Sequence, residues 1–536
     1  MKKITNLCML LMLLFMSKGL LAQNVLTVSS DQDSGAGSLR QLIADATAGD
    51  SIVIPGGYTI VINSEIAFDK DLKINGQGAI VKVAEPGISN WRVFTLGTTT
   101  STAKTVSLYN LNMEGGNVSG NGGTIYVNLN HTFSMKNCTV SKGKGAYVGG
   151  LMIYSAAGTT VNLENCTFSE NEGTTNNGGA CILKGNTVVK NCVFSNNTVK
   201  QNGAAIAAYS QTLIENCTFI NNTSNGTTGS AVINYAAATG SVDLVNCTFE
   251  SNSHVNVTNG VGGFAIANAV ANSTLTNCTF YKNSGQTSGA IWNNKGNLKL
   301  INCTFAGNTT LSANGGAINN TNHADAKTTI VNSILTHNYN SGGLMDLSMG
   351  AAGTVNGGYN IAGAVTGTPG YTNSVTFSYS PASDIYSAYT TTGNLMPVLA
   401  NNGGATKTIA LSNTSIANGA GTATFGDPNI VPTTDQRGIS RATAPSIGAY
   451  EYKVPTGTTT SIEPKFRVYP NPASEILYLD GESTINSLEI IDLSGKKVLS
   501  IEHPANTISL DGISQGLYIL KILSAEGQTQ MKITIR

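Results

Sequence analysis

The sequence predicts an all-β protein in which a long parallel β-helix, a solenoid, is followed by a small antiparallel β-sandwich. A block with the order apolar residue, any residue, Asn, Cys, Thr, Phe recurs along the chain every 25 to 31 residues. A period of this size is typical of a solenoid. Within each block the apolar residues alternate with a period of two, as in strands, which excludes helical repeats. The stretch from Phe466 to Arg536 also alternates but lacks the repeat, so we expect a separate domain there.

The composition limits the classes of function. Of the 536 residues, 41% are hydrophobic, which is enough for a long core and too many for a disordered chain. The 30 basic and 30 acidic residues balance, which argues against a nucleic-acid partner. No arginine occurs between Arg92 and Arg437, so phosphate or uronate binding in that stretch would depend on scattered lysines. A polyanion is therefore a poor candidate ligand.

The N-terminus has the pattern of a signal peptide, which we assign to residues 1–22. Lys2 and Lys3 precede the apolar run from Leu7 to Phe15, and Ala22 is a suitable small residue for cleavage. The apolar run is too short to span a bilayer. No later stretch reaches 18 apolar residues, so we expect no transmembrane helix in the mature protein.

The repeat also predicts where each coil bends and what fills its core. The Asn before each Cys is expected at a bend, because Asn tolerates the left-handed conformation. Like residues of successive coils should then form columns spaced by about 4.8 Å. Disulfides are the alternative for cysteines of an exported chain. We expect free thiols, since stacked side chains point the same way and give poor disulfide geometry. The cysteines in the repeat are Cys138, Cys166, Cys192, Cys217, Cys247, Cys278 and Cys303.

The N-terminal end of the solenoid needs a cap, because an open end would expose core and unpaired strand edges. Ser38 can cap a short helix that ends at Gly49-Asp50, and Ile52 to Ile54 begin the first coil. The apolar residues Leu39, Leu42, Ile43 and Ala46 fall on one face of that helix.

Several motifs add a family resemblance over most of residues 25 to 452. Asp33 to Arg40, followed by Ala48 to Ile52, resembles the opening segment of right-handed parallel β-helix surface proteins. The repeated Gly-Gly-Ala-Ile and Phe-x-x-Asn motifs resemble those of polymorphic outer-membrane proteins. Residues 397–406, 435–438 and 447–451 resemble the choice-of-anchor Q domain, in which this segment closes a β-helix. The resemblance implies a right-handed coil over residues 23–452 and display at the cell surface, but no chemistry.

Residues 453–464, rich in Thr and Gly, predict a linker, and residues 465–536 predict a small sandwich of short strands. Val468 to Ala473, Ile491 to Lys496, and Gly516 to Tyr518 resemble motifs of the type IX secretion C-terminal sorting domain. The C-terminal residues 532–536 share this resemblance. It implies that the type IX machinery is a partner and carries the protein across the outer membrane. The protein is then released or stays attached to surface lipopolysaccharide.

A set of aromatic residues provides the candidate binding site. Tyr126, Tyr154 and Trp292 stand one residue after the Ile of a Gly-Ala-Ile type block. Tyr209 and Tyr235 stand three residues after the equivalent aliphatic residue. We expect these five side chains to line the outward face of one sheet, where aromatic rings can stack on sugars. The sequence therefore favours an adhesin or glycan-binding rod.

The alternative is a polysaccharide-active enzyme, a lyase or hydrolase on a β-helix scaffold. Such enzymes need clustered or paired carboxylates. Glu164 and Glu215 share one slot of the repeat and could form a weak pair, and region 340–435 contains Asp346, Asp384 and Asp427. The sequence leaves catalysis open but does not favour it, and we assign no catalytic residue, metal ligand or cofactor. A column of Thr residues is expected to face outward as ordinary sheet surface: Thr139, Thr167, Thr218, Thr248, Thr279 and Thr304.

Overall fold

The structure is a computed structural model. It describes residues 23–97, 102–128, 131–154, 160–236, 240–255, 260–266, 271–376, 385–390, 396–426, 428–453, 467–480, 485–492, 496–524 and 527–536. The predicted signal peptide and most of the predicted linker lie outside these residues. The chain divides into two compact units, Met1–Tyr452 and Lys453–Arg536. Among the residues described, no helix has the length and apolar character needed to cross a membrane.

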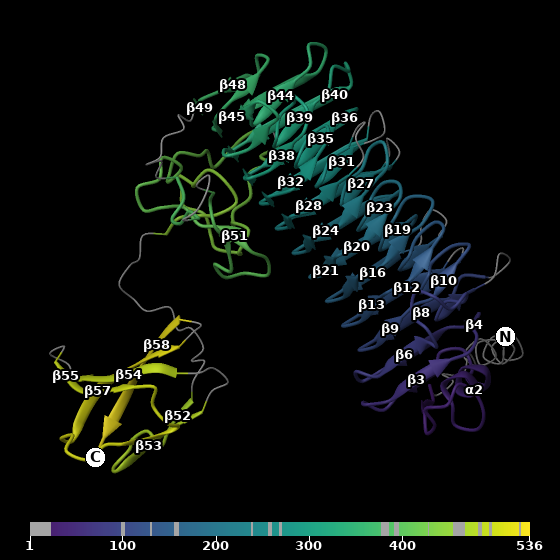
Figure 1. Ribbon diagram of the computed structural model, residues 1–536, viewed down its shortest axis with the longest axis horizontal. Helices are drawn as coiled ribbons and strands as arrows, with labels where there is room; N and C mark the ends of the chain where they lie inside the picture. Colours follow the sequence, from purple (N-terminus) through teal and green to yellow (C-terminus); the bar gives the residue numbers. More distant parts are fainter. Residues whose placement is uncertain are drawn as a thin grey trace, which may run out of the picture. The chain divides into compact units, whose positions relative to one another are not determined.

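The first unit is the predicted parallel β-solenoid, and its coils are visible as successive rungs in Figure 1. One coil comprises β16 (Thr160–Glu164), β17 (Thr167–Ser169), β18 (Glu172–Gly173) and β19 (Cys181–Leu183), after which β20 (Asn186–Lys190) pairs with β16. We call the sheets built from these four positions the first, second, third and fourth sheets. In the described residues they contain 14, 13, 10 and 12 strands.

The strands within each sheet are parallel, apart from a hairpin at the end of the third sheet between β42 (Tyr339–Asn340) and β43 (Gly343–Leu344). The fourth sheet carries the candidate site. Its strands are β4 (Ile66–Phe68), β7 (Phe94–Leu96), β11 (Ile125–Val127), β15 (Leu151–Ile153), β19, β23 (Ile206–Ala208), β27 (Val232–Asn234), β31 (Phe264–Ile266), β35 (Ile291–Asn293), β39 (Ile318–Asn320), β44 (Leu347–Met349) and β47 (Val365–Thr366).

The predicted Asn bends are confirmed. The residue before each repeat cysteine has a positive φ, for example 54° at Asn137 and 52° at Asn165. Its side chain bonds to the same position in a neighbouring coil: Asn165 Nδ2 donates to Asn137 Oδ1 at 3.1 Å, and Asn191 donates to Asn165 in the same way. We call this column the outer Asn ladder. It joins consecutive coils at the bend between the first and second sheets.

A second Asn column, the inner Asn ladder, lies fully buried just after the second sheet. Here each amide donates toward the C-terminal coil: Asn197 Nδ2 donates to Asn222 Oδ1 at 2.9 Å. The ladder ends where Asn338 donates to the buried carboxylate of Asp346, at 2.8 Å from Nδ2 and 3.1 Å from the backbone nitrogen. Its members are Asn171, Asn197, Asn222, Asn252, Asn283, Asn308 and Asn338.

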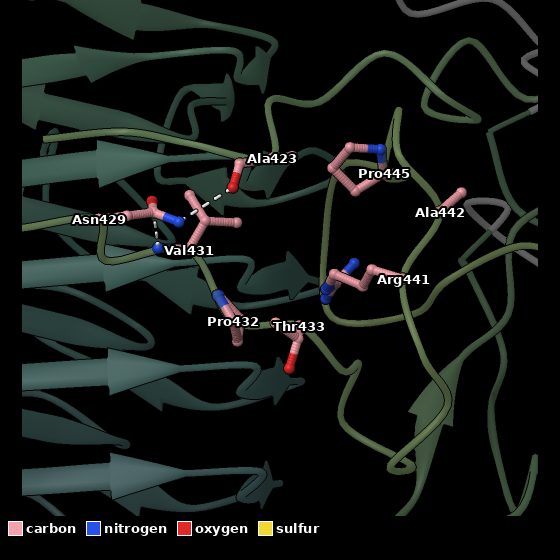
Figure 2. Close-up of a pocket in the computed structure, with 8 residues that line it drawn as sticks. All are labelled: Ala423, Asn429, Val431, Pro432, Thr433, Arg441, Ala442 and Pro445. Atoms are coloured by element: carbon pink, nitrogen blue, oxygen red, sulfur yellow. Dashed lines mark hydrogen bonds between the residues drawn. The ribbon is translucent and has the colours of Figure 1, made fainter.

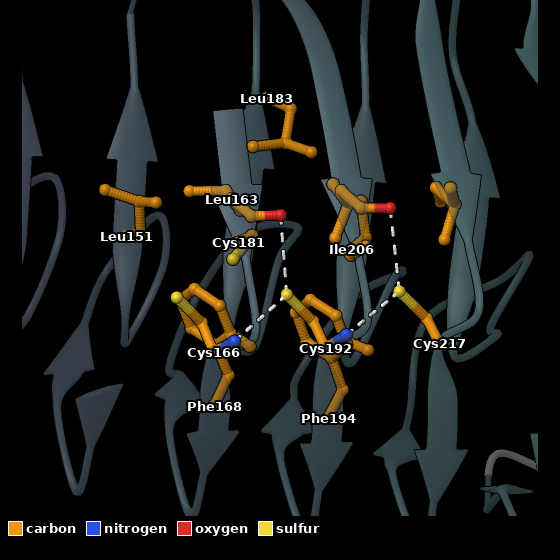
Figure 3. Close-up of a cluster of buried hydrophobic side chains, with 14 of the residues drawn as sticks. Leu151, Leu163, Cys166, Phe168, Cys181, Leu183, Cys192, Phe194, Ile206 and Cys217 are labelled. Atoms are coloured by element: carbon orange, nitrogen blue, oxygen red, sulfur yellow. Dashed lines mark hydrogen bonds between the residues drawn. The ribbon is translucent and has the colours of Figure 1, made fainter. Parts of the chain in front are cut away.

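The core contains the expected columns of Phe and Cys (Figure 3). The rings of Phe168 and Phe194 are parallel with centroids 4.9 Å apart, and this stacking continues to Phe305. The eight cysteines of the described chain are free and buried, which confirms the prediction of free thiols. Burial raises the pKa of the Cys181 and Cys217 thiols, which keeps them un-ionised.

The N-terminal cap is present as helix α2 (Leu39–Asp45). Ser38 is its N-cap and accepts a hydrogen bond from the Gln41 backbone at 3.2 Å. Leu39, Ile43 and Ala46 are buried against the first coils. The helix ends at Asp45, before the expected Gly49-Asp50, because Ala46 has an extended ψ of 141°.

Residues 396–452, which we call the closing segment, lie along the outer face of the second sheet. The segment includes β50 (Leu399–Ala400) and β51 (Thr408–Ile409). Thr248 Oγ1 donates to the Lys407 carbonyl at 2.7 Å, and Thr304 Oγ1 accepts from the Ala449 backbone at 2.9 Å. The expectation that the whole Thr column is surface was therefore wrong. Thr248, Thr279 and Thr304 are buried beneath the segment, whereas Thr139, Thr167 and Thr218 remain partly exposed.

The second unit contains two antiparallel sheets around a small apolar core. The three-stranded sheet consists of β52 (Arg467–Tyr469), β53 (Ile476–Asp480) and β56 (Thr507–Ser509). The four-stranded sheet consists of β54 (Ile485–Asp492), β55 (Lys497–Glu502), β57 (Gly516–Ser524) and β58 (Gly527–Ile535). The predicted fold class, a parallel β-helix followed by small antiparallel sheets, is confirmed.

Candidate functional site

The middle residue of each three-residue strand in the fourth sheet points away from the solenoid core. Tyr126 of β11 pairs in register with Met152 of β15, and Ala265 of β31 pairs with Trp292 of β35. Tyr126 and Trp292 therefore share one column, as predicted. The residues between them in this column are Met152, Ile182, Ala207, Ile233 and Ala265.

The placement of Tyr154 in that column was wrong. Tyr154 directly follows β15, just as Tyr209 follows β23 and Tyr235 follows β27. The prediction treated Ile153 as equivalent to Ile125, the first residue of β11. Ile153 instead pairs with Val127, the last residue of β11, so Tyr154 lies beyond its strand. The three tyrosines thus occupy one position in their coils, and Lys184, after β19, fills the same position in the coil between Tyr154 and Tyr209. We call Tyr154, Lys184, Tyr209 and Tyr235 the tyrosine row.

The outward column is not an open surface, contrary to expectation. Trp292 is only 8% exposed and belongs to an apolar cluster outside the fourth sheet. The connections from the third to the fourth sheet fold over this face and contribute Val148 and Val261. Tyr126, Tyr209 and Tyr235 pack against the edge of the cluster and are partly buried.

The tyrosine row keeps contact with solvent, and its members are arranged face to face. Tyr154 is 38% exposed, and the Lys184 ammonium lies 4.4 Å from the centre of its ring. The same ammonium lies 5.5 Å from the Tyr209 ring on its other side. Tyr209 stacks on Tyr235 with centroids 5.0 Å apart and an angle of 20° between the rings. Because the stacked rings of Tyr209 and Tyr235 cover one face of each other, their edges and hydroxyl groups form the surface.

Two amides from the covering connections hold the ring hydroxyls. Asn177 Nδ2 donates to Tyr209 Oη at 2.9 Å, and Asn202 Nδ2 donates to Tyr235 Oη at 2.8 Å. Asn202 also donates to Asn177 Oδ1 at 3.2 Å. Burial raises the pKa of Tyr209, and raises that of Tyr235 to about 12, so both phenols are protonated near neutral pH. The row is fixed in position by these bonds.

Tyr126 lies apart from the row. The Arg92 guanidinium is 5.6 Å from its ring centre, and its hydroxyl donates to Asn128 Oδ1 at 3.3 Å. Burial raises the pKa of Tyr126 as well. Of the five predicted site residues, the structure therefore brings together Tyr154, Tyr209 and Tyr235. Sequence reasoning missed Lys184. Its only signal was that it directly follows its aliphatic strand, as Tyr209 and Tyr235 follow theirs.

The carboxylates of the first sheet alternate with lysines. Lys136, Glu164, Lys190 and Glu215 follow one another in successive coils. Lys136 and Glu164 form an ion pair at 3.0 Å, and Lys190 and Glu215 form one at 3.2 Å. Glu164 and Glu215 do not form the weak pair that their shared slot allowed, because Lys190 occupies the coil between them. In the part of the chain that the structure describes, no group of three His, Cys, Asp or Glu residues is placed to hold a metal ion.

In region 340–435, Asp346 is the acceptor that ends the inner Asn ladder, while Asp384 and Asp427 lie outside the described residues. A pocket of about 130 Å³ is present in the closing segment (Figure 2). Its charged residue, Arg441, has a side chain only 3% exposed and donates to Asn277 at 2.8 Å and to Glu451 at 3.2 Å. Burial lowers the pKa of Arg441, and Glu451 opposes that shift. These bonds make Arg441 a structural contact between the segment and the solenoid.

The motif around Asn471 in the second unit has a clear structural role. Asn471 Nδ2 donates to the Lys532 carbonyl, and Asn471 Oδ1 accepts from the Thr534 backbone, both at 2.9 Å. The Ala473 backbone then donates to the Thr534 carbonyl and accepts from Arg536. The motif thus fastens the last strand, β58, to the rest of its domain.

Comparison with protein families gives two matches. Residues 124–305 match the model of a right handed beta helix region, and residues 467–536 match the secretion system C-terminal sorting domain. The chain carries both domains. The sorting domain implies interaction with the type IX secretion machinery. It indicates export across the outer membrane to the cell surface or the extracellular space, which confirms the predicted location.

The other comparisons are less informative. No curated protein matches the chain. Among solved structures, the crystal structure of pectate lyase Pel9A is similar, with 17% sequence identity and a TM-score of 0.38. That similarity covers 80% of this chain and 96% of the other. The choice-of-anchor Q and polymorphic outer-membrane protein resemblances remain predictions.

Proposed function

We propose that this exported β-helix is a non-catalytic rod, an adhesin, that binds an extracellular glycan along the tyrosine row. The observation that carries the proposal is the position of Tyr154, Lys184, Tyr209 and Tyr235 in four consecutive coils of one sheet. Coil spacing of about 4.8 Å approaches the repeat of an extended glycan. The row therefore offers regularly spaced contacts to a chain-like ligand.

The chemistry of the row suits sugars. Tyrosine combines an apolar body with a polar end, so its ring edge can contact C–H groups while its oxygen bonds to sugar hydroxyls. Asn177 and Asn202 fix the hydroxyls of Tyr209 and Tyr235, and the two rings stack on each other. A row held in this way loses little conformational freedom on binding, which favours affinity.

The pairing of the nearby carboxylates supports binding over catalysis. Glu164 and Glu215 are held in ion pairs with lysines on the first sheet. Asp243 accepts hydrogen bonds from Ser241 Oγ and the Thr274 backbone. A lyase or hydrolase would require carboxylates placed together and facing a substrate. The enzyme hypothesis makes a distinct prediction, namely product formation from a bound polysaccharide.

The proposal is tested by screening the full chain on a glycan array and assaying turnover of every glycan that binds. The double change Tyr209→Ala and Tyr235→Ala should weaken binding about thirtyfold, at about 1 kcal/mol for each ring contact. Tyr147→Ala is the matched control, because Tyr147 is 48% exposed and lies outside the row. Unchanged binding by the double variant would move the site elsewhere, and release of shorter sugars would establish an enzyme.

A further inference from the structure

We propose that the glycan bound by the tyrosine row is acidic, and that the Lys184 ammonium binds its carboxylate or sulfate group. This inference rests on the proposed function and adds the chemical class of the ligand. Lys184 lies between Tyr154 and Tyr209, with its ammonium 4.4 Å and 5.5 Å from their ring centres. It is the cation of an otherwise uncharged row.

Lys184 has no acidic partner among the described residues, so no carboxylate of the chain neutralises the ammonium that lies between the two tyrosine rings. Five lysines of the first unit each lie within 3.2 Å of a carboxylate: Lys136, Lys142, Lys144, Lys190 and Lys407. The sequence from 173 to 214 contains no Asp or Glu. Earlier in the same coil, Glu164 and Glu172 form ion pairs with Lys136 and Lys144 instead. Its positive charge is available to a ligand.

The surroundings of Lys184 favour an anionic ligand group. The two tyrosine rings attract the cation and hold it at a fixed place in the row. Partial burial lowers the pKa of Lys184, because it removes water from the ammonium. An anion bound beside the ammonium would replace that lost solvation and form a charge-assisted hydrogen bond.

The number of cations points to a sparsely charged recognition site rather than a polyanion cradle. The row contains one lysine across four coils, and the chain has no arginine between Arg92 and Arg437. One anionic group of the glycan can bind the single ammonium. The two flanking tyrosines can then contact the faces and hydroxyls of the sugars on either side of that group. A uronate carboxylate and a sulfate ester share this chemistry.

The test compares binding of the full chain to polygalacturonate, dextran sulfate and neutral dextran by calorimetry. The wild-type chain should bind at least one acidic polymer more tightly than neutral dextran. Lys184→Met should weaken that binding at least tenfold, because it removes the charge and keeps the length of the side chain. Lys184→Arg should retain most of the affinity. Lys200→Met is the control, since Lys200 is an exposed lysine of the neighbouring connection.

Each outcome separates this inference from the proposed function. Tighter binding of polygalacturonate identifies a carboxylate, and tighter binding of dextran sulfate identifies a sulfate. Equal affinity for acidic and neutral polymers, or full affinity in Lys184→Met, would overturn the inference. If the neutral polymer alone binds and Tyr209→Ala weakens it, the glycan-binding function stands and the acidic ligand is wrong. Binding to none of the glycans on the array or these polymers would overturn both.

Discussion

The outer faces of the second and fourth sheets are both covered, but by different parts of the chain. On the second sheet the cover comes from the distant closing segment, which attaches through hydrogen bonds to Thr248, Thr279 and Thr304. On the fourth sheet it comes from the connections of the coils themselves, which attach through apolar contacts around Trp292. The same repeat therefore supports a polar, long-range contact on one side and an apolar, local contact on the other.

The apolar cover gives the largest expected effect. Trp292→Ala should destabilise the first unit by about 3 kcal/mol, because it leaves a cavity in the cluster outside the fourth sheet. Tyr154→Ala in the exposed part of the same sheet should cost less than about 1 kcal/mol. Denaturant unfolding of both variants measures the difference. Equal losses would show that the connections do not bury Trp292 in solution.

The polar cover depends strongly on Gln436. Its Nε2 donates to Thr248 Oγ1 at 2.8 Å, and its Oε1 accepts from Thr279 Oγ1 at 2.6 Å. Gln436→Ala should cost about 2–3 kcal/mol, since it leaves the buried Thr279 hydroxyl without its partner and removes the bond to Thr248. Limited proteolysis should then cut the closing segment before the solenoid. Gln211→Ala, at an exposed position, provides the control, and unchanged protease resistance in the Gln436 variant would contradict the contact.

The contact beside the polar cover, where residues 385–390 pair with the closing segment, should also weaken in acid through His337. His337 lies against Tyr386 and Tyr389, with ring centres 6.1 Å and 5.7 Å away. Burial lowers the pKa of His337 from 6.5 to about 4. The unfolded chain therefore binds this proton more readily, and stability falls as the pH drops from about 6.5 towards 4, by up to about 3 kcal/mol. His337→Asn should remove this component, because Asn196 and Asn221 hold the same positive-φ turn in other coils. Melting temperatures of the wild-type chain and the His337→Asn variant across that pH range test this prediction, and an equal fall in both would contradict it.

The smallest expected effect compares the two halves of the Thr column. Thr279→Val, beneath the closing segment, should cost about 1–2 kcal/mol through the lost bond to Gln436. Thr167→Val, in the uncovered half, should change stability by less than about 0.5 kcal/mol. Similar losses at both positions would mean that the uncovered half also has a partner in solution.

Features that recur in every coil were predictable from the sequence. The Asn bends, the Phe stack and the free thiols follow from a repeat whose period can be read directly from the sequence. Asn137 and Cys217 occupy their expected places. The phase of the fourth sheet was less certain, because the connection before it varies in length and an Ile can fill either end of a three-residue strand. Tyr154 was misplaced for that reason.

Contacts between parts of the chain that lie far apart left no local pattern. Gln436 and Thr279 are 157 residues apart, so nothing in the repeat indicated which threonines would be covered. The burial of Trp292 was missed for a related reason, since connections without regular structure cover it. Lys184 escaped notice because a lysine interrupts an aromatic series, although its ring contacts make it part of the row.

The two Asn ladders run in opposite directions, and this has an electrostatic consequence. Amide groups aligned head to tail add their dipoles, as the peptide units of a helix do, so a single ladder would give the rod a positive and a negative end. In the inner ladder the amide of Asn197 donates toward the C-terminal coil, whereas in the outer ladder that of Asn165 donates toward the N-terminal coil. The two macrodipoles oppose each other along the rod, and the carboxylate of Asp346 meets the positive end of the inner ladder. A solenoid built in this way can gain or lose coils without building up a net macrodipole.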